Sequence, residues 1–134
     1  MRKILAVDDD PKVLKVFEAA LEHRGYQVFV TTEPTEVAQL LTQHDFALVM
    51  LDIQMPKKNG LEVFAELKKK YQNLPVLFIT AYTQSFSMGS DDMVELWTRD
   101  FADGNTDIIY KPFSVDALYQ KVEGLIGKPD EQTS

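Results

Sequence analysis

Several residues with reactive or metal-binding side chains follow short apolar runs of this chain. They are four carboxylates, a hydroxyl and an ammonium, at positions Asp8, Asp9, Asp10, Asp52, Thr80 and Lys111. Two carboxylates about 4 Å apart repel each other by roughly 4 kcal/mol at an effective dielectric constant near 20, so a group of them must take up protons or a cation. Because one lysine cannot neutralise the whole group, we expect a hard divalent ion there.

Magnesium suits such a set of oxygen ligands. It typically uses one or two carboxylates, keeps several waters and leaves room for a phosphate, and Mn²⁺ or Ca²⁺ could occupy the same ligands. A carboxylate held by this metal, beside a lysine and a threonine that hold phosphoryl oxygens, is equipped to attack phosphorus and form an acyl phosphate. The residue types therefore indicate phosphoryl chemistry, provided that the fold brings them together.

The elements that must position these side chains alternate between apolar runs and segments with a helical period. The runs are rich in β-branched and aromatic residues and predict strands over residues 4–7, 28–30, 46–51, 76–79 and 108–110. Apolar residues at helical spacing predict helices over residues 11–24, 37–41, 61–71, 93–101 and 115–125. Asp10 is expected to cap the first helix, with Pro11 at its first position and Gly25 just past its end.

Alternation of strand and helix favours a parallel sheet with helices on both faces. In such a sheet ligands bind beyond the carboxyl ends of the strands. The acidic residues, the threonine and the lysine all follow predicted strands, so we expect them to meet at this one edge. The second strand contributes no obvious group there.

Composition limits the other possibilities. A chain of 134 residues, 45% hydrophobic and 26% charged, fits a single domain, here residues 1–127 followed by a polar tail at 128–134. That tail suits either a stand-alone domain or the start of a linker in a longer protein. The absence of cysteine excludes disulfides and thiolate metal sites, and the net charge of -7 argues against direct nucleic-acid binding. With no long apolar run, we expect a cytoplasmic protein that does not contact a membrane.

Four motifs together resemble the receiver domain of two-component response regulators. They are "ILAVDDDP", "VMLDIQMPKKNGLEV", "PVLFITAY" and "DIIYKPF", and the resemblance covers residues 2–127. It implies a flavodoxin-like, doubly wound, five-stranded parallel sheet with strand order 2-1-3-4-5 and helices on both faces. It further implies that Asp52 accepts a phosphoryl group from a sensor histidine kinase or a histidine phosphotransfer protein and so switches a downstream effector domain or protein.

The resemblance also assigns roles at the metal. Asp9 and Asp52 would bind Mg²⁺ directly, Asp8 would act largely through water, and the main-chain carbonyl of Gln54 would complete the protein ligands. Such a protein promotes its own phosphorylation and dephosphorylation but is not a turnover enzyme on a separate substrate.

The remaining implied roles concern the phosphoryl group. Thr80 and Lys111 would hold its oxygens, and the bond between Lys111 and Pro112 would be cis. Simpler interpretations exist: the acids could serve only as helix caps or turn residues, Thr80 could satisfy local backbone, and Lys111 could be a surface lysine. Asp10 is assigned to capping alone.

Two other functions compete with a phosphorylated receiver. A phosphatase of the haloacid dehalogenase type also uses an aspartate at a strand end, Mg²⁺ and a lysine, but it usually has an acid two residues after the nucleophile, where this chain has Gln54. A pseudo-receiver would keep the fold without being phosphorylated. Such domains tend to lose an acid, the threonine or the lysine, and this chain has them all.

The stretch between Thr80 and Lys111 is longer than is usual in receivers. We expect an enlarged loop and fourth helix at about residues 81–107. An aromatic residue three positions before the lysine usually turns inward in the switch, but Ile108 stands there in this chain. We therefore hypothesise that the enlarged segment, which is acidic, reads out phosphorylation to a partner with a basic surface. The alternative is a loop without such a role.

Overall fold

A computed structural model describes residues 2–53, 60–81 and 105–127 of the chain. The strands are β1 (Lys3–Val7), β2 (Gln27–Thr31), β3 (Leu48–Asp52), β4 (Val76–Ala81) and β5 (Thr106–Lys111). The helices are α1 (Pro11–Arg24), the short 3-10 helix η1 (Pro34–Glu36), α2 (Val37–Gln43), α3 (Gly60–Lys70) and α5 (Val115–Ile126). Every predicted strand is present, although β3 begins at Leu48, two residues later than the apolar run suggested.

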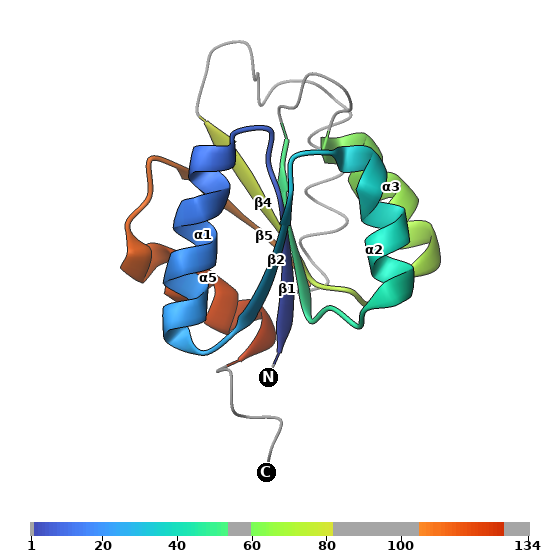
Figure 1. Cartoon of the computed structure of the whole chain (residues 1–134). Coiled ribbons are helices and arrows are strands. Elements are labelled where there is room, and N and C mark those ends of the chain that lie inside the picture. Colours follow the sequence, from blue (N-terminus) through green and yellow to red (C-terminus); the bar gives the residue numbers. More distant parts are fainter. Residues whose placement is uncertain (1, 54–59, 82–104, 128–134) are drawn as a thin grey trace.

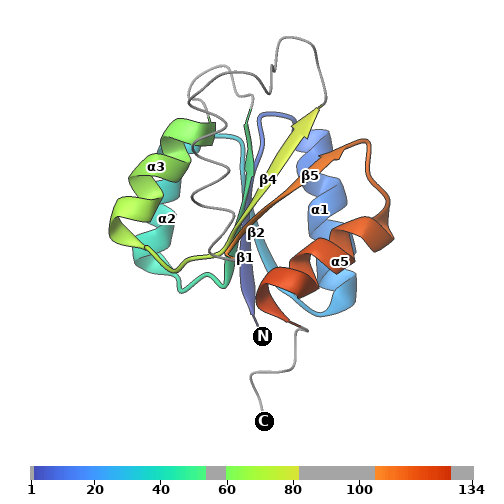
Figure 2. The same cartoon turned by 180° about the vertical axis from the view of Figure 1, so that it is seen from behind.

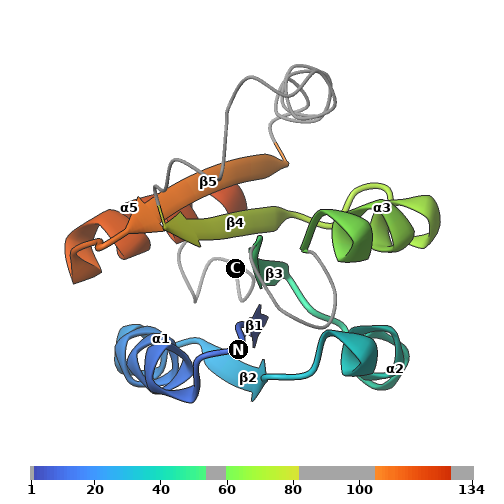
Figure 3. The ribbon, with the colours of Figure 1, turned by 90° about the horizontal axis from the view of Figure 1, so that it is seen from above.

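The strands form one parallel sheet in the order β2-β1-β3-β4-β5. In Figures 1 and 3, α1 and α5 cover one face of this sheet, and α2 and α3 cover the other. Figure 2 shows the molecule from behind, with β4 and β5 in front. The expected doubly wound α/β fold and its strand order are therefore confirmed.

The alternation of side chains along the inner strands builds two cores. In β1, Ile4 and Ala6 join the apolar cluster under α1 and α5, whereas Leu5 and Val7 join the cluster under α2 and α3. Because successive strand residues point to opposite faces, a strand covered on both faces must be apolar at every position. This explains why the sequence shows continuous apolar runs rather than alternating ones.

The first helix begins and ends as the sequence predicts. The Asp10 side chain accepts a hydrogen bond from the backbone N–H of Lys12 at 2.9 Å, and Pro11 occupies the first helical position. Gly25 ends the helix with φ of 110°, a left-handed conformation that glycine adopts at little cost. The capping role of Asp10 is thus confirmed, and α1 starts directly after the acidic residues.

The third helix starts unusually close to the end of β3. A Cβ atom added to Gly60 would lie 2.9 Å from the Cα of Ile53 and nearer still to the carbonyl oxygen of Asp52, where ordinary contact begins at 3.4 Å. The backbone N–H of Gly60 donates to the carbonyl of Ile53 at 3.0 Å. Only glycine fits here, so α3 can pack directly against the strand end that carries Asp52.

Two predictions fall on residues that the structure does not describe. The predicted fourth helix and most of the predicted enlarged segment fall within residues 82–104, and Gln54 falls within residues 54–59, so these predictions lie outside the described residues. Within the described parts of the chain, no helix combines the length and apolar character needed to cross a membrane.

Candidate functional site

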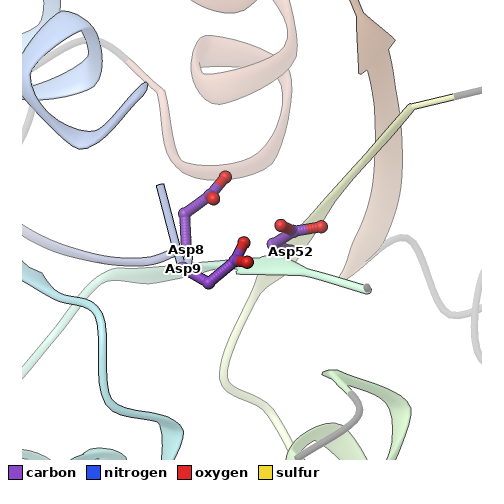
Figure 4. A group of neighbouring side chains, drawn as sticks. All are labelled: Asp8, Asp9 and Asp52. Atoms are coloured by element: carbon purple, nitrogen blue, oxygen red, sulfur yellow. The ribbon is translucent and has the colours of Figure 1, made fainter. Parts of the chain in front are cut away.

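The predicted acidic residues meet at the carboxyl edge of the sheet. Val7 is in register with Leu51, so Asp8 and Asp52 follow adjacent strands at the same level. One carboxylate oxygen from each of Asp8, Asp9 and Asp52 lies within 4.8 Å of the others. Figure 4 shows the three side chains gathered at the ends of β1 and β3.

Asp8 is the most firmly held of the three acids. Its side chain is fully buried. Its Oδ1 accepts a hydrogen bond from the backbone N–H of Asp10 at 2.9 Å, and its Oδ2 accepts one from Nζ of Lys111 at 2.9 Å. Its own backbone N–H donates to the carbonyl oxygen of Thr31 at 3.3 Å. Both carboxylate oxygens of this buried group therefore have partners, as its burial requires.

The carbonyl of Thr31 is a contribution that the sequence did not reveal. The second strand offers no ionisable side chain at its tip, but its last residue supports Asp8 through the main chain. Side-chain patterns carry no signal for such a backbone contact.

Asp9 and Asp52 differ in exposure. Asp9 is exposed, whereas Asp52 is 4% exposed and forms the last residue of β3. An exposed and a buried carboxylate side by side can bind one cation between them, with its remaining positions open to solvent.

The ammonium of Lys111 bridges two of the acids. Its Nζ lies 2.9 Å from Oδ2 of Asp8 and 3.7 Å from Oδ2 of Asp52. Burial lowers the pKa of Lys111, but the hydrogen bond to Asp8 and the charges of Asp52, Asp8 and Asp9 outweigh burial and hold that pKa above its ordinary value. The lysine therefore stays protonated and cancels part of the negative charge.

Thr80 and the turn after Lys111 complete the site. Thr80 is fully buried on β4, next to Tyr110 of β5 in the ladder, at the same edge of the sheet. The bond between Lys111 and Pro112 is cis, as the resemblance to receiver domains implied. Of the predicted side-chain positions, the structure thus places five at one edge: Asp8, Asp9, Asp52, Thr80 and Lys111.

The donor set fits a hard divalent cation. It consists of carboxylate oxygens alone, and three acids against one lysine leave a formal excess of two negative charges. Such oxygen-rich sites with few protein ligands suit Mg²⁺, which retains water and reaches phosphates. The arrangement can therefore bring a divalent ion and a phosphoryl group to the side chain of Asp52.

Comparison with known proteins agrees with this geometry. The model of the response regulator receiver domain family matches residues 4–123. Response regulator SaeR of Staphylococcus aureus (strain USA300) is 30% identical over 132 residues, which covers 94% of this chain and 51% of SaeR. The chain thus spans about half the length of the curated relatives it matches.

Solved structures show the same fold. Chemotaxis protein CheY4 of Vibrio cholerae has a TM-score of 0.78 at 24% identity, covering 93% of this chain and 98% of CheY4. Response regulator TrrA of Thermotoga maritima, solved in complex with Mg(2+)-BeF, has a TM-score of 0.76 at 31% identity, covering 93% of this chain and 99% of TrrA. The family model matches most of the sequence, and the fold and the cluster of acids agree with that match. This chain therefore belongs to the response regulator receiver domain family of two-component systems.

Proposed function

We propose that Asp52 accepts a phosphoryl group from a sensor histidine kinase or a histidine phosphotransfer protein in the cytoplasm, with Mg²⁺ bound beside it. The observation that carries this proposal is the cluster itself. Three carboxylates lie within 4.8 Å of one another, and Lys111 lies 3.7 Å from Asp52. No simple capping or turn role requires acids from two strands and a lysine from a third to converge.

Asp52 is the best candidate for the nucleophile. Asp8 already has both carboxylate oxygens engaged, and Asp9 is exposed to water. Asp52 is buried at a strand end, where the close approach of Gly60 fixes its backbone. In the transfer, an oxygen of Asp52 forms a bond to phosphorus while the bond from phosphorus to the donor nitrogen breaks.

The other residues of the site would hold the phosphoryl group and the metal. Asp9 and Asp52 would bind Mg²⁺ directly, Asp8 would act through water, and the main-chain carbonyl of Gln54 would complete the protein ligands. The bound ion would supply charge neutralisation for the carboxylates and the incoming phosphoryl oxygens. The ammonium of Lys111 and the hydroxyl of Thr80 would each hold one of those oxygens, and so stabilise the negative charge of the phosphoryl group during the transfer.

The phosphorylated domain would act on a downstream effector domain or protein. Some matched relatives are longer than this chain: it covers 51% of SaeR, and 27% of NtrX from Brucella abortus, whereas it covers 98% of CheY4. A receiver that promotes only its own phosphorylation and dephosphorylation needs such an output. All the groups that a pseudo-receiver tends to lose are retained at the described edge, which favours a phosphorylated domain.

Incubation with acetyl phosphate and Mg²⁺, followed by intact-mass measurement, tests this function. One acid-labile phosphoryl adduct that needs Mg²⁺ is the expected result. Steady release of phosphate without an adduct would indicate a phosphatase. If neither an adduct nor phosphate release is seen at Mg²⁺ concentrations that saturate the metal site, the protein is a pseudo-receiver.

A further inference from the structure

The position of Lys111 in the sheet raises a geometric problem. Asp8 follows β1 and Lys111 ends β5, and these two strands are separated by β3 and β4. Three strand spacings amount to about 14 Å in a flat sheet, which is much longer than the four-carbon stem of a lysine. Yet Nζ of Lys111 lies 2.9 Å from Asp8.

The twist of the sheet brings the end of β5 part of the way toward Asp8. Figure 2 shows β4 and β5 crossing β1 at an angle, which carries the end of β5 over the face that α1 and α5 cover. Asp52 is in register with Ile79 and Ile79 with Ile109, so Lys111 lies two residues beyond the level of Asp52. Lys111 itself is in the last ladder pair, opposite Ala81, so contacts outside the sheet must fix the path of the chain that follows it.

One such contact joins the turn after Lys111 to α1. The ring of Phe113 stacks on the ring of Phe17 with centroids 5.3 Å apart and planes inclined by 7°. Phe17 is fully buried in the core under α1 and α5, whereas Phe113 is partly buried and packs against that core. A ring anchored to a rigid core holds the chain two residues after Lys111.

The helix that carries Phe17 also starts directly after the acids. Asp10 caps α1, and its backbone N–H donates to the carboxylate of Asp8. The Phe17–Phe113 stack therefore ties together the two segments that carry the partners of the Asp8–Lys111 ion pair. The next residue after Phe113 is Ser114, whose hydroxyl caps α5 by accepting a hydrogen bond from the backbone N–H of Ala117 at 3.0 Å.

We propose that Phe113 is a positioning residue for Lys111: by stacking on Phe17 it holds the turn after β5 against α1 and keeps the lysine ammonium at Asp8, within reach of Asp52. The inference deepens the proposed function and rests on it for its consequence in phosphoryl transfer. The placement of the ammonium itself is independent of that function, so the two parts have separate tests.

The first test measures where the ammonium of Lys111 lies. Brief acetylation with acetic anhydride, read by peptide mass spectrometry, reports the access of each lysine, with exposed Lys12 as the internal reference. In Phe113→Leu the ring is lost while an apolar side chain remains, and acetylation of Lys111 should rise several-fold relative to wild type. Phe113→Tyr keeps the stacked ring and should leave the labelling of Lys111 unchanged.

A matched control separates positioning from general loss of packing. Phe46 is buried in the other core, before β3 at the opposite edge of the sheet, and its ring contacts Phe29 with centroids 5.4 Å apart. Phe46→Leu removes a comparable aromatic pair and should not change the labelling of Lys111. Labelling that stays at the wild-type level in Phe113→Leu, or rises equally in Phe46→Leu, overturns the positioning role.

The second test follows acyl-phosphate formation from acetyl phosphate and Mg²⁺. If Phe113 acts through the lysine, Phe113→Leu should slow the reaction on the order of tenfold to a hundredfold, as misplacing a reactive group does. In a Lys111→Met background the same substitution should change the remaining rate by less than about twofold.

The rates of the two single variants and the double variant distinguish the positioning role of Phe113 from the proposed function. If the effects of Phe113→Leu and Lys111→Met multiply, Phe113 acts by another route and the inference fails. If wild type forms no acyl phosphate, the proposed function fails, and the acetylation experiment alone decides whether Phe113 positions the lysine.

Discussion

Replacing Gly60 by alanine should damage both the fold and the site, because this glycine allows α3 to pack against the end of β3. The new Cβ would meet only backbone atoms, among them the Cα of Ile53 at 2.9 Å and, closer still, the carbonyl oxygen of Asp52. Ordinary contact begins at 3.4 Å, so the helix and the strand must separate by at least half an ångström. Backbone atoms cannot move aside as a flexible side chain can.

The magnitude follows from two opposing effects. Forced overpacking costs about 1–3 kcal/mol, occasionally more, while alanine in a helix gains at most about 1 kcal/mol over glycine, and less at a first helical position such as this one. The net loss should be about 1–2 kcal/mol or larger. At this chain length each kcal/mol corresponds to about 3–5 °C in Tm, so Gly60→Ala should melt about 3–10 °C, or more, below wild type.

A second glycine provides the matched control. Gly124 lies within α5, is exposed, and an added Cβ there would meet nothing within 4 Å. Gly124→Ala should therefore raise the free energy of unfolding by about 0.5–1 kcal/mol through helix propensity. Urea denaturation and thermal melting of both variants without Mg²⁺ measure the contrast. The reasoning is refuted if Gly60→Ala is as stable as wild type, or if both alanines shift stability in the same direction.

Three further predictions concern the acidic edge. Asp52→Asn should abolish acyl-phosphate formation with the circular dichroism spectrum unchanged, since amide and carboxylate are nearly isosteric; undiminished incorporation would place the acceptor elsewhere. Mg²⁺ at about 100 times its measured Kd should stabilise wild type by about 2.7 kcal/mol, and Asp9→Ala should lose most of that gain, whereas a full effect in the variant would locate the ion away from Asp9. Lys111→Met leaves buried Asp8 without its cation, and because the lysine side chain is 24% exposed the metal-free protein should lose about 1–3 kcal/mol. Mg²⁺ should recover more stability in that variant than in wild type, and melting curves that show an equal or smaller recovery would contradict a shared charge site.

Most of the site residues at the carboxyl edge of the sheet could be predicted, because the sequence pattern that marks each of them is local. Each reactive residue lies at or directly after an apolar run, and parallel strands bring their carboxyl ends to one edge. Asp8, Asp9, Asp52, Thr80 and Lys111 are accordingly found there. The capping of α1 by Asp10 was equally local, since it depends on residues within one turn. Strand order came from the family resemblance, because periodicity predicts the face of a residue but not its neighbouring strand.

What the sequence missed depends on contacts between distant segments. In the sequence, an Asn-Gly pair such as Asn59 and Gly60 is typical of an ordinary turn, but the structure shows that Gly60 allows the close packing of α3 on β3. Helical spacing places Phe17 on the apolar face of the first helix, and Phe113 ends the motif "DIIYKPF", but only the folded chain brings their rings together. The carbonyl of Thr31 that accepts from Asp8 has no side-chain signature at all. The hypotheses on Gln54 and on readout through residues 81–107 concern parts of the chain that lie largely outside the described residues.

The most direct test of the central claim is to identify the phosphorylated residue. Protein treated with acetyl phosphate and Mg²⁺ is reduced with borohydride, which converts an aspartyl phosphate to homoserine, and is then digested and sequenced by mass spectrometry. Our account predicts homoserine at position 52 alone, and none when Mg²⁺ is chelated beforehand. Homoserine at position 8 or 9, or a phosphorylated protein whose Asp52 remains aspartate after reduction, would contradict it.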